Sequence, residues 1–210
     1  MRIINKISTC VVCLASLMLS MTSCSEKEEA GEYDNWEVRN IHYVDSIAKV
    51  CDLNADGRWT KFCAFNLNDS VEALSPNNLH YVYVHKLEDG TGDYSPLYKD
   101  SIRVHYLGRL IPSVSYPQGY IFGKSYGTYT FNEATDVPAL MAVNDNIVGF
   151  ATAVMNMVEG DNWRLYIPYY IGYGATTNSS SSIPAYSTLI FDVKLARVYK
   201  YKIDTDTSWH

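Results

Sequence analysis

The sequence lacks the spaced motifs on which most catalytic and metal centres depend. Its five histidines occur without ligand spacing and without paired cysteines, so no metal centre is predicted. No Gly-x-Ser-x-Gly elbow is present for an acyl-transfer nucleophile. The segment GTGDYSP has two glycines but opens no helix, which argues against a phosphate-binding loop. No cofactor is predicted.

The chain also lacks a cluster of lysines and arginines. It contains 17 basic residues against 23 acidic ones, and loss of a leader that carries Arg2 and Lys6 would change the net charge from -6 to -8. Clustered cations are the usual means of holding the phosphates of a nucleic acid. We therefore expect no nucleic-acid partner.

Residues 1–23 have the composition of an export signal. Arg2 and Lys6 precede an apolar stretch, Ile7 to Met21, that is too short to span a bilayer comfortably. The stretch ends in Met-Thr-Ser-Cys24, which resembles a bacterial lipobox, where the cysteine becomes the lipidated first residue after cleavage. The alternative is an ordinary signal peptide with a cysteine near its end.

Residues 24–35 form an acidic tether that resembles the short signals sending some Gram-negative lipoproteins to the cell surface. Each buried methylene of a lipid contributes about 0.8 kcal/mol, so several acyl chains on Cys24 would attach the chain stably to a membrane. This interpretation predicts a lipid-anchored protein of the cell envelope. We expect it in the outer membrane, facing the periplasm or the surface.

Cys51 and Cys63 remain once the leader and the lipidation site are set aside. In an oxidising compartment they either form a disulfide or stay as two buried thiols, and the sequence leaves both open. Between them, DLNADG has the opening of a calcium loop. The twelfth position is Cys63 instead of a bidentate Glu, so a plain Asp/Gly turn is the preferred interpretation.

A helical extension is predicted at residues 36–79. Ile41, Val44, Ala48 and Cys51 fall at spacings of three and four, which is typical of an amphipathic helix. The rest of this segment is rich in turn-forming residues.

From His80 onward the pattern changes to that of a β-rich domain, residues 80–202. Apolar and polar residues alternate in HYVYVHKL, SIRVHYLGRL, NWRLYI and TLIFDVKLARVY, which predicts strands. The segment NIVGFATAVMNM has a single helical face instead. Strands around one short helix indicate an α+β fold with an antiparallel sheet.

Tyrosines are concentrated in LYIPYYIGYGATTNSSSSIPAYSTLIFDVKL, residues 165–195. Rings in this number either fill a core or hold a ligand. The same region contains YIGYGA and IPAYSTLIFDVKL, and upstream of it lie VHYLGRL, GYIFGKS and NIVGFATAVMNMVEGDNWRLYIP.

In order and spacing, these five segments resemble the FKBP-type peptidyl-prolyl cis–trans isomerases. The resemblance covers about residues 80–200 and implies a curved antiparallel sheet wrapped on one short α-helix. Residues 36–79 lie outside it and look like the N-terminal extension of some exported bacterial members. The lipobox is consistent with an exported lipoprotein member.

The resemblance also implies an aromatic pocket between sheet and helix that receives a proline ring. Phe150 would form its floor, Tyr173 would offer its hydroxyl to a substrate carbonyl, and Ile147 would offer its backbone N–H. The catalytic set would be Tyr173, Phe122, Phe191 and Tyr106, and the substrate-binding set Ile147, Phe150, Ile183 and Asn146. For Tyr106, Phe150 and Phe191, plain core packing is the alternative.

Three positions depart from the family pattern. Gly123 follows Phe122 where an acidic residue is usual, and Phe150 forms the floor where tryptophan is usual. Asn146 replaces a small apolar residue beside Ile147. These departures predict weak activity.

The predicted function is isomerisation of X-Pro bonds in exported polypeptides by a monomer whose partners are proline-containing polypeptides. The alternative is a catalytically inactive lipoprotein of the same fold that binds a polypeptide through its aromatic groove. A third interpretation, a surface lipoprotein whose tyrosines stack on sugars, is open to a glycan-array test.

Overall fold

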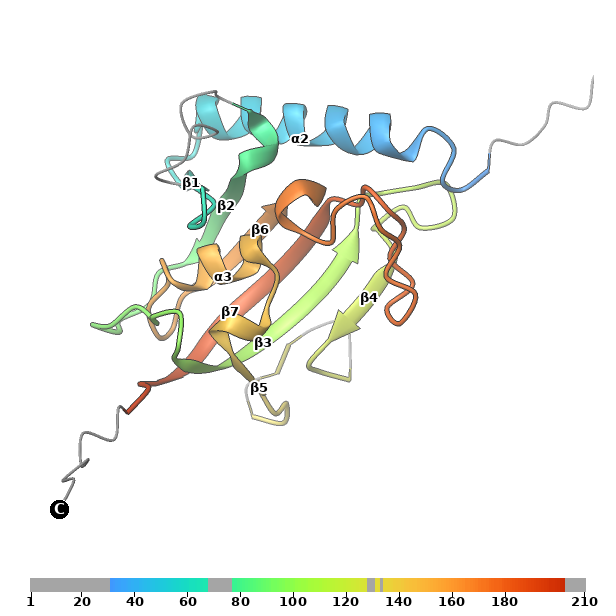
Figure 1. Ribbon diagram of the computed structural model, residues 1–210. Coiled ribbons are helices and arrows are strands. Elements are labelled where there is room, and N and C mark those ends of the chain that lie inside the picture. Colours follow the sequence, from blue (N-terminus) through green and yellow to red (C-terminus); the bar gives the residue numbers. More distant parts are fainter. Residues whose placement is uncertain (1–30, 68–76, 128–130, 133, 203–210) are drawn as a thin grey trace, which may run out of the picture. The chain divides into compact units, whose positions relative to one another are not determined.

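A computed structural model describes residues 31–67, 77–127, 131–132 and 134–202 (Figure 1). The chain divides into two compact units, Met1–Gly31 and Glu32–His210, and the fold described below is that of the second. The predicted signal peptide, Cys24 and most of the acidic tether lie outside the described residues. Within the described ranges, no helix is long and apolar enough to cross a membrane.

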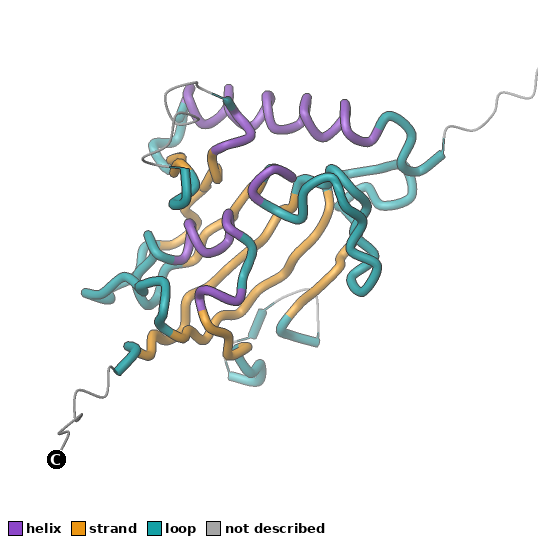
Figure 2. Tube along the Cα trace, viewed as in Figure 1, coloured by secondary structure: helices purple, strands orange, loops and turns teal. Residues whose placement is uncertain are grey.

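Seven strands form one antiparallel sheet in the order β1-β2-β6-β7-β3-β4, and β5 also pairs with β3 (Figure 2). The strands are β1 (Trp59–Cys63), β2 (Tyr81–Glu88), β3 (Ser101–Leu110), β4 (Ile121–Lys124), β5 (Ala139–Ala142), β6 (Asn162–Ile167) and β7 (Leu189–Tyr199). The four segments predicted to be strands are confirmed as β2, β3, β6 and β7. β1, β4 and β5 were missed, because four or five residues are too few for alternation to be recognised.

The short helix α3 (Val148–Val154) packs against one face of this sheet. From β6, Trp163, Leu165 and Ile167 are at most 2% exposed, so the alternate residues of this strand face the core together. A Cβ atom at Gly149 would lie 2.4 Å from Cγ2 of Ile167. Glycine therefore permits the close approach of α3 to β6, and the predicted α+β architecture with one central helix is confirmed.

The predicted helical extension contains α2 (Trp36–Leu53) and also the strand β1, which pairs with β2. α2 covers the other face of the sheet near β1 and β2 (Figure 1). Val82 and Val84 of β2 belong to the core beneath α3, whereas Tyr83 points away from them and packs against Val44 and Ala48 of α2. All three β2 residues have 0% exposure. The strand is therefore buried on both faces at this point, and the extension is part of the folded domain.

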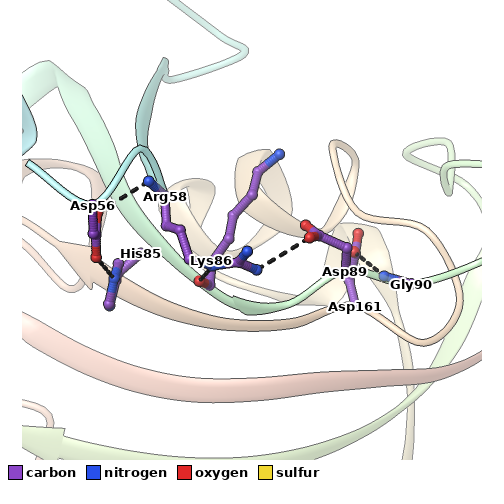
Figure 3. A network of polar contacts seen from close by, with 7 residues as sticks. All are labelled: Asp56, Arg58, His85, Lys86, Asp89, Gly90 and Asp161. Atoms are coloured by element: carbon purple, nitrogen blue, oxygen red, sulfur yellow. Dashed lines mark hydrogen bonds and ion pairs between the residues drawn. The ribbon is translucent and has the colours of Figure 1, made fainter. Parts of the chain in front are cut away.

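The turn after α2 is tied to β2 by polar contacts (Figure 3). Asp56 accepts a hydrogen bond from the Arg58 N–H at 3.0 Å and lies 2.7 Å from Nε2 of His85. The Arg58 side chain donates to the Lys86 carbonyl at 2.6 Å and pairs with Asp89 at 3.2 Å. The Asp56 carboxylate of the DLNADG segment thus bonds within its own turn and to His85 of the neighbouring strand β2, as expected for a plain Asp/Gly turn.

Cys51 and Cys63 are both free thiols. Cys51 is buried on the inner face of α2 beside Tyr83, and burial raises the pKa of its thiol. Cys63 lies at the end of β1, opposite Tyr81 of β2. The sequence left open a disulfide or two thiols, and the structure has no disulfide between Cys51 and Cys63.

Candidate active site

A cavity of about 250 Å³ opens where β3, β4 and β7 meet the start of α3. Two 3₁₀ helices, η3 (Val143–Asp145) and η4 (Tyr169–Ile171), lie directly before segments that complete its wall. The lining consists of Tyr106, Phe122, Gly123, Met141, Asp145, Asn146, Ile147, Phe150, Tyr173, Ser181 and Phe191. Residues predicted from five separate segments of the sequence therefore meet in one place.

Phe191 lies at the centre of the aromatic base of this cavity. Its ring contacts those of Phe122 and Phe150 edge to face, each at 5.3 Å between centroids, and lies 6.3 Å from that of Tyr106. Phe150 and Phe191 are only 3% and 7% exposed. Core packing and cavity lining are thus both true of these two rings, and their edge-to-face contacts stabilise the apolar base.

Gly108 on β3 makes room for that base. A Cβ atom there would lie 2.5 Å from Cε2 of Phe122 and 2.8 Å from Cε1 of Phe191. Any larger residue would displace one of the rings. The glycine of the VHYLGRL segment is therefore required by the position of the two phenylalanines.

Ile147 and Asn146 form the wall just before α3. The Ile147 carbonyl accepts the Ala151 N–H at 3.0 Å, which begins the helix, and its own N–H has no acceptor within the described part of the chain. The Asn146 side-chain amide donates to the Ala142 carbonyl at 2.7 Å. Asn146 thus lines the cavity as predicted, but its amide is engaged in holding the η3 turn.

Tyr173 stands at the rim and is 39% exposed. Its position is set by the next residue: the Gly174 N–H donates to the Tyr169 carbonyl at 2.8 Å, and Gly174 adopts a φ of 71° that favours glycine. Burial, and then the proximity of Tyr106, raise the pKa of the Tyr173 hydroxyl. The group therefore stays protonated at neutral pH and can donate a hydrogen bond.

Ile183 was predicted to line the pocket, but it is not among the residues that line this cavity, and its role in substrate binding stays a prediction. Its side chain is 0% exposed and belongs to the core. The backbones of Asn178 and Ile183 exchange two hydrogen bonds, of 2.9 and 3.1 Å, which close a tight loop. That loop brings Ser181 to the cavity, while Ile183 points inward.

Met141, Asp145 and Ser181 line the cavity but were not recognised in the sequence. Asp145 is exposed and contributes a carboxylate to the wall. The sequence feature that could have identified Asp145 is its position two residues before Ile147. At Gly123 an added Cβ atom would lie 3.5 Å from the Tyr106 ring, an ordinary contact, so a side chain can begin there without displacing that ring.

Comparison with known proteins agrees with this geometry. Residues 92–196, half of the chain, match the family described as FKBP-type peptidyl-prolyl cis-trans isomerase. The crystal structure of a peptidyl-prolyl cis-trans isomerase from Pseudomonas syringae pv. tomato has the same fold, with a TM-score of 0.52 and 23% identity over 77% of this chain and 95% of that one.

Curated relatives match over the same part of the chain. The macrophage infectivity potentiator of Trypanosoma cruzi is 34% identical over 113 residues, 54% of this chain and 50% of its own length. The FKBP-type 22 kDa peptidyl-prolyl cis-trans isomerase of Escherichia coli is 36% identical over 103 residues, 49% of this chain and 43% of its own length. This chain thus spans half or less of these two relatives.

A shorter relative is covered almost completely. The FK506-binding protein of Neisseria meningitidis serogroup A is 31% identical over 117 residues, which are 56% of this chain and 95% of that protein. The matched region contains all of the cavity-lining residues. On these grounds, the chain belongs to the family of FKBP-type peptidyl-prolyl cis-trans isomerases.

Proposed function

We propose that this chain isomerises X-Pro bonds in exported polypeptides, and that its cavity receives the proline ring. The observation that carries the proposal is the cavity, with an apolar base of Phe122, Phe150 and Phe191 and the Tyr173 hydroxyl at its rim. Family membership supports the same reaction class.

The physical chemistry of the X-Pro bond suits such a cavity. Amide resonance creates a barrier of about 18–20 kcal/mol, so uncatalysed rotation takes tens to hundreds of seconds. A twisted amide has lost this resonance and carries less charge on its oxygen. A site that removes water from the amide therefore stabilises the twisted state more than the planar one, without an acid, base or nucleophile.

The described residues can divide this work between them. Phe150 and Phe191 provide the apolar surface against which the proline ring would lie. Tyr173, protonated at neutral pH, would donate to a neighbouring carbonyl of the substrate and fix its orientation.

We propose further that Cys24 carries lipid and anchors the domain in the outer membrane, as a monomer that meets proline-containing polypeptides in the cell envelope. The support is the lipobox-like Met-Thr-Ser-Cys and the acidic tether that separates it from the domain. Metabolic labelling with a fatty acid tests the anchor. Incorporation in the wild type and its loss in Cys24→Ala are expected, and an unlabelled wild type would contradict it.

Exchange NMR on a short Xaa-Pro peptide with purified residues 25–210 tests the activity. We expect cis–trans exchange faster than in the free peptide, and loss of the acceleration when Phe191→Ala removes the central ring. A folded wild-type protein that gives no acceleration would contradict the enzymatic proposal and favour the binding module.

Gly123 is the observation that favours this second function, because the acidic side chain usual in the family is absent. Since a Cβ atom at this position makes only ordinary contacts, Gly123→Asp should fold normally and raise kcat/KM by about tenfold, the effect of one added charge-assisted hydrogen bond. Gly123→Asn, of the same size but uncharged, is the matched control. Equal activity in both variants and the wild type would show that the missing carboxylate is irrelevant.

A further inference from the structure

The first turns of α2 bond directly to the segment that precedes β7. The Trp36 indole N–H donates to the Ser187 hydroxyl at 2.9 Å, across 151 positions of the sequence. The Asn40 side-chain oxygen accepts the Thr188 N–H at 2.7 Å, across 148 positions. All four residues are at most 6% exposed, so these bonds are shielded from water and removal of one partner would be costly.

The orientation of Asn40 is itself determined. Its amide nitrogen donates to the Trp36 carbonyl at 2.7 Å, which leaves its oxygen to face Thr188. Trp36 also reaches the main core rather than the smaller cluster beneath α2. The beginning of α2 is therefore a fixed point against which the segment before β7 is held.

That segment leads back to the cavity. The Ser187 hydroxyl donates onward to the Pro184 carbonyl at 2.7 Å. The neighbouring Tyr186 has a φ of 61°, a left-handed conformation that a residue with a side chain keeps only when its surroundings enforce it. The Tyr186 N–H donates to the Gly174 carbonyl at 2.9 Å, and Gly174 follows Tyr173.

The loop between these points is also held by the buried Ile183 side chain and by the Tyr186 ring, which packs edge to face on that of Tyr169 at 5.2 Å. Residues 174–188 contain one isolated bridge, Asn178 to Ile183, and a run of four serines. Two residues of the cavity wall are tied to this loop: Ser181 belongs to it, and Tyr173 directly precedes it. Small polar residues gain little from burial, so external contacts are needed to offset the entropy lost on ordering.

We propose that Trp36 and Asn40 are positioning residues of the active site: they hold residues 184–188 and, through Tyr186 and Gly174, the rim residue Tyr173. The inference rests on the proposed function, because it assigns to α2 the task of placing a hydroxyl that contacts substrate. It also gives a role to the N-terminal extension, which lies outside the matched family region of residues 92–196.

The test compares two variants of the same helix in the lipid-free mature chain. Asn40→Leu removes the bond to Thr188 with little change in size, whereas Val44→Ala weakens α2 where it packs on Tyr83, away from the loop. Both lose stability, so kcat and KM are measured at a temperature where each is fully folded. We expect kcat/KM to fall roughly tenfold in Asn40→Leu through misplacement of Tyr173, and to stay within twofold in Val44→Ala.

A double-mutant cycle of Trp36→Phe and Ser187→Ala isolates the second bond. If the indole N–H acts through Ser187, the double variant should lose no more kcat/KM than either single variant. Fully multiplicative losses would show that the two residues act independently and would contradict this part of the proposal.

Hydrogen exchange of the Tyr186 and Gly174 amides gives a readout that does not need catalysis. Faster exchange in Asn40→Leu than in Val44→Ala supports the holding of the loop, even if the wild type proves to be inactive and the proposed function fails. Equal exchange and equal kcat/KM in the two variants would overturn the inference.

Discussion

Tyr83 and Tyr173 show how differently the two sides of this domain use an aromatic ring. Tyr83 lies beneath α2 with 0% exposure, and its hydroxyl donates to the Asn78 carbonyl at 3.0 Å. Tyr173 stands at the cavity rim with 39% exposure. The same residue type serves packing on one side and is available to a ligand on the other, so the tyrosine content of a segment does not by itself locate a site.

The two sides differ because a long helix covers one of them, whereas glycines leave space on the other. On the covered side, the long helix α2 lies over β1 and β2, and Trp59 stacks between His85 and Tyr166 at 4.6 and 5.6 Å. On the cavity side, Gly108 admits the rings of the base and Gly123 leaves space beside Tyr106. One side is therefore filled, and the other keeps room for a substrate group.

Phe150→Ala should have the largest effect on stability. Its ring is 3% exposed and contacts Phe191 edge to face, so truncation should lower the free energy of unfolding by roughly 3–5 kcal/mol. Urea denaturation measures this loss. A loss below about 1 kcal/mol would show that the cavity base is not part of the core, and would remove the dual role assigned to it.

Tyr83→Phe should have an intermediate effect, confined to the covered side. It removes the hydroxyl bonded to the Asn78 carbonyl and should lower the free energy of unfolding by about 1 kcal/mol. Isomerase activity should not change. A variant that folds normally but isomerises more slowly would show that Tyr83, and not only the start of α2 at Trp36 and Asn40, influences catalysis.

Alkaline pH should weaken the covered side by a smaller, gradual amount. Burial raises the pKa of Tyr43 to about 12, and also raises the pKa of Tyr83 and Tyr166. Since the folded pKa lies above the unfolded value near 10, this stability is complete below pH 10 and is lost as pH rises toward 12.

Urea midpoints measured between pH 8 and pH 11.5 test this expectation. They should be constant at first and fall above pH 10, and Tyr43→Phe should reduce the fall. Stability that declines equally in Tyr43→Phe and the wild type would exclude Tyr43 as a contributor.

Tyr173→Phe should have the smallest effect on stability, within about 0.5 kcal/mol, because the hydroxyl is at an exposed rim. Its effect should appear in kcat/KM, which we expect to fall roughly tenfold through loss of one substrate hydrogen bond. Exchange NMR with thermal unfolding on the same sample separates the two quantities. Unchanged turnover would show that the hydroxyl has no role.

Much of the candidate site could be predicted because its residues occupy regular elements or follow them at short range. Tyr106, Phe122, Ile147, Phe150, Tyr173 and Phe191 all line the cavity, as the family resemblance implied, while their roles in catalysis remain predictions. Ile183 could not be placed, because a loop residue turns inward or outward according to how the loop closes. Ser181 was missed for the same reason, and Asp145 was missed because it ends the short 3₁₀ helix η3, which has no periodic pattern in the sequence.

The sequence by itself determined the elements that depend on local periodicity: the strands with alternating residues and the helices α2 and α3. The single apolar face predicted for α3 was wrong, because Gly149 to Val154 are all buried. Only the tertiary structure decided which rings are covered. It also decided that Trp36 and Asn40 meet Ser187 and Thr188. Those contacts join segments about 150 residues apart, and no local pattern records them, because they exist only when the packed core brings both segments to the same place.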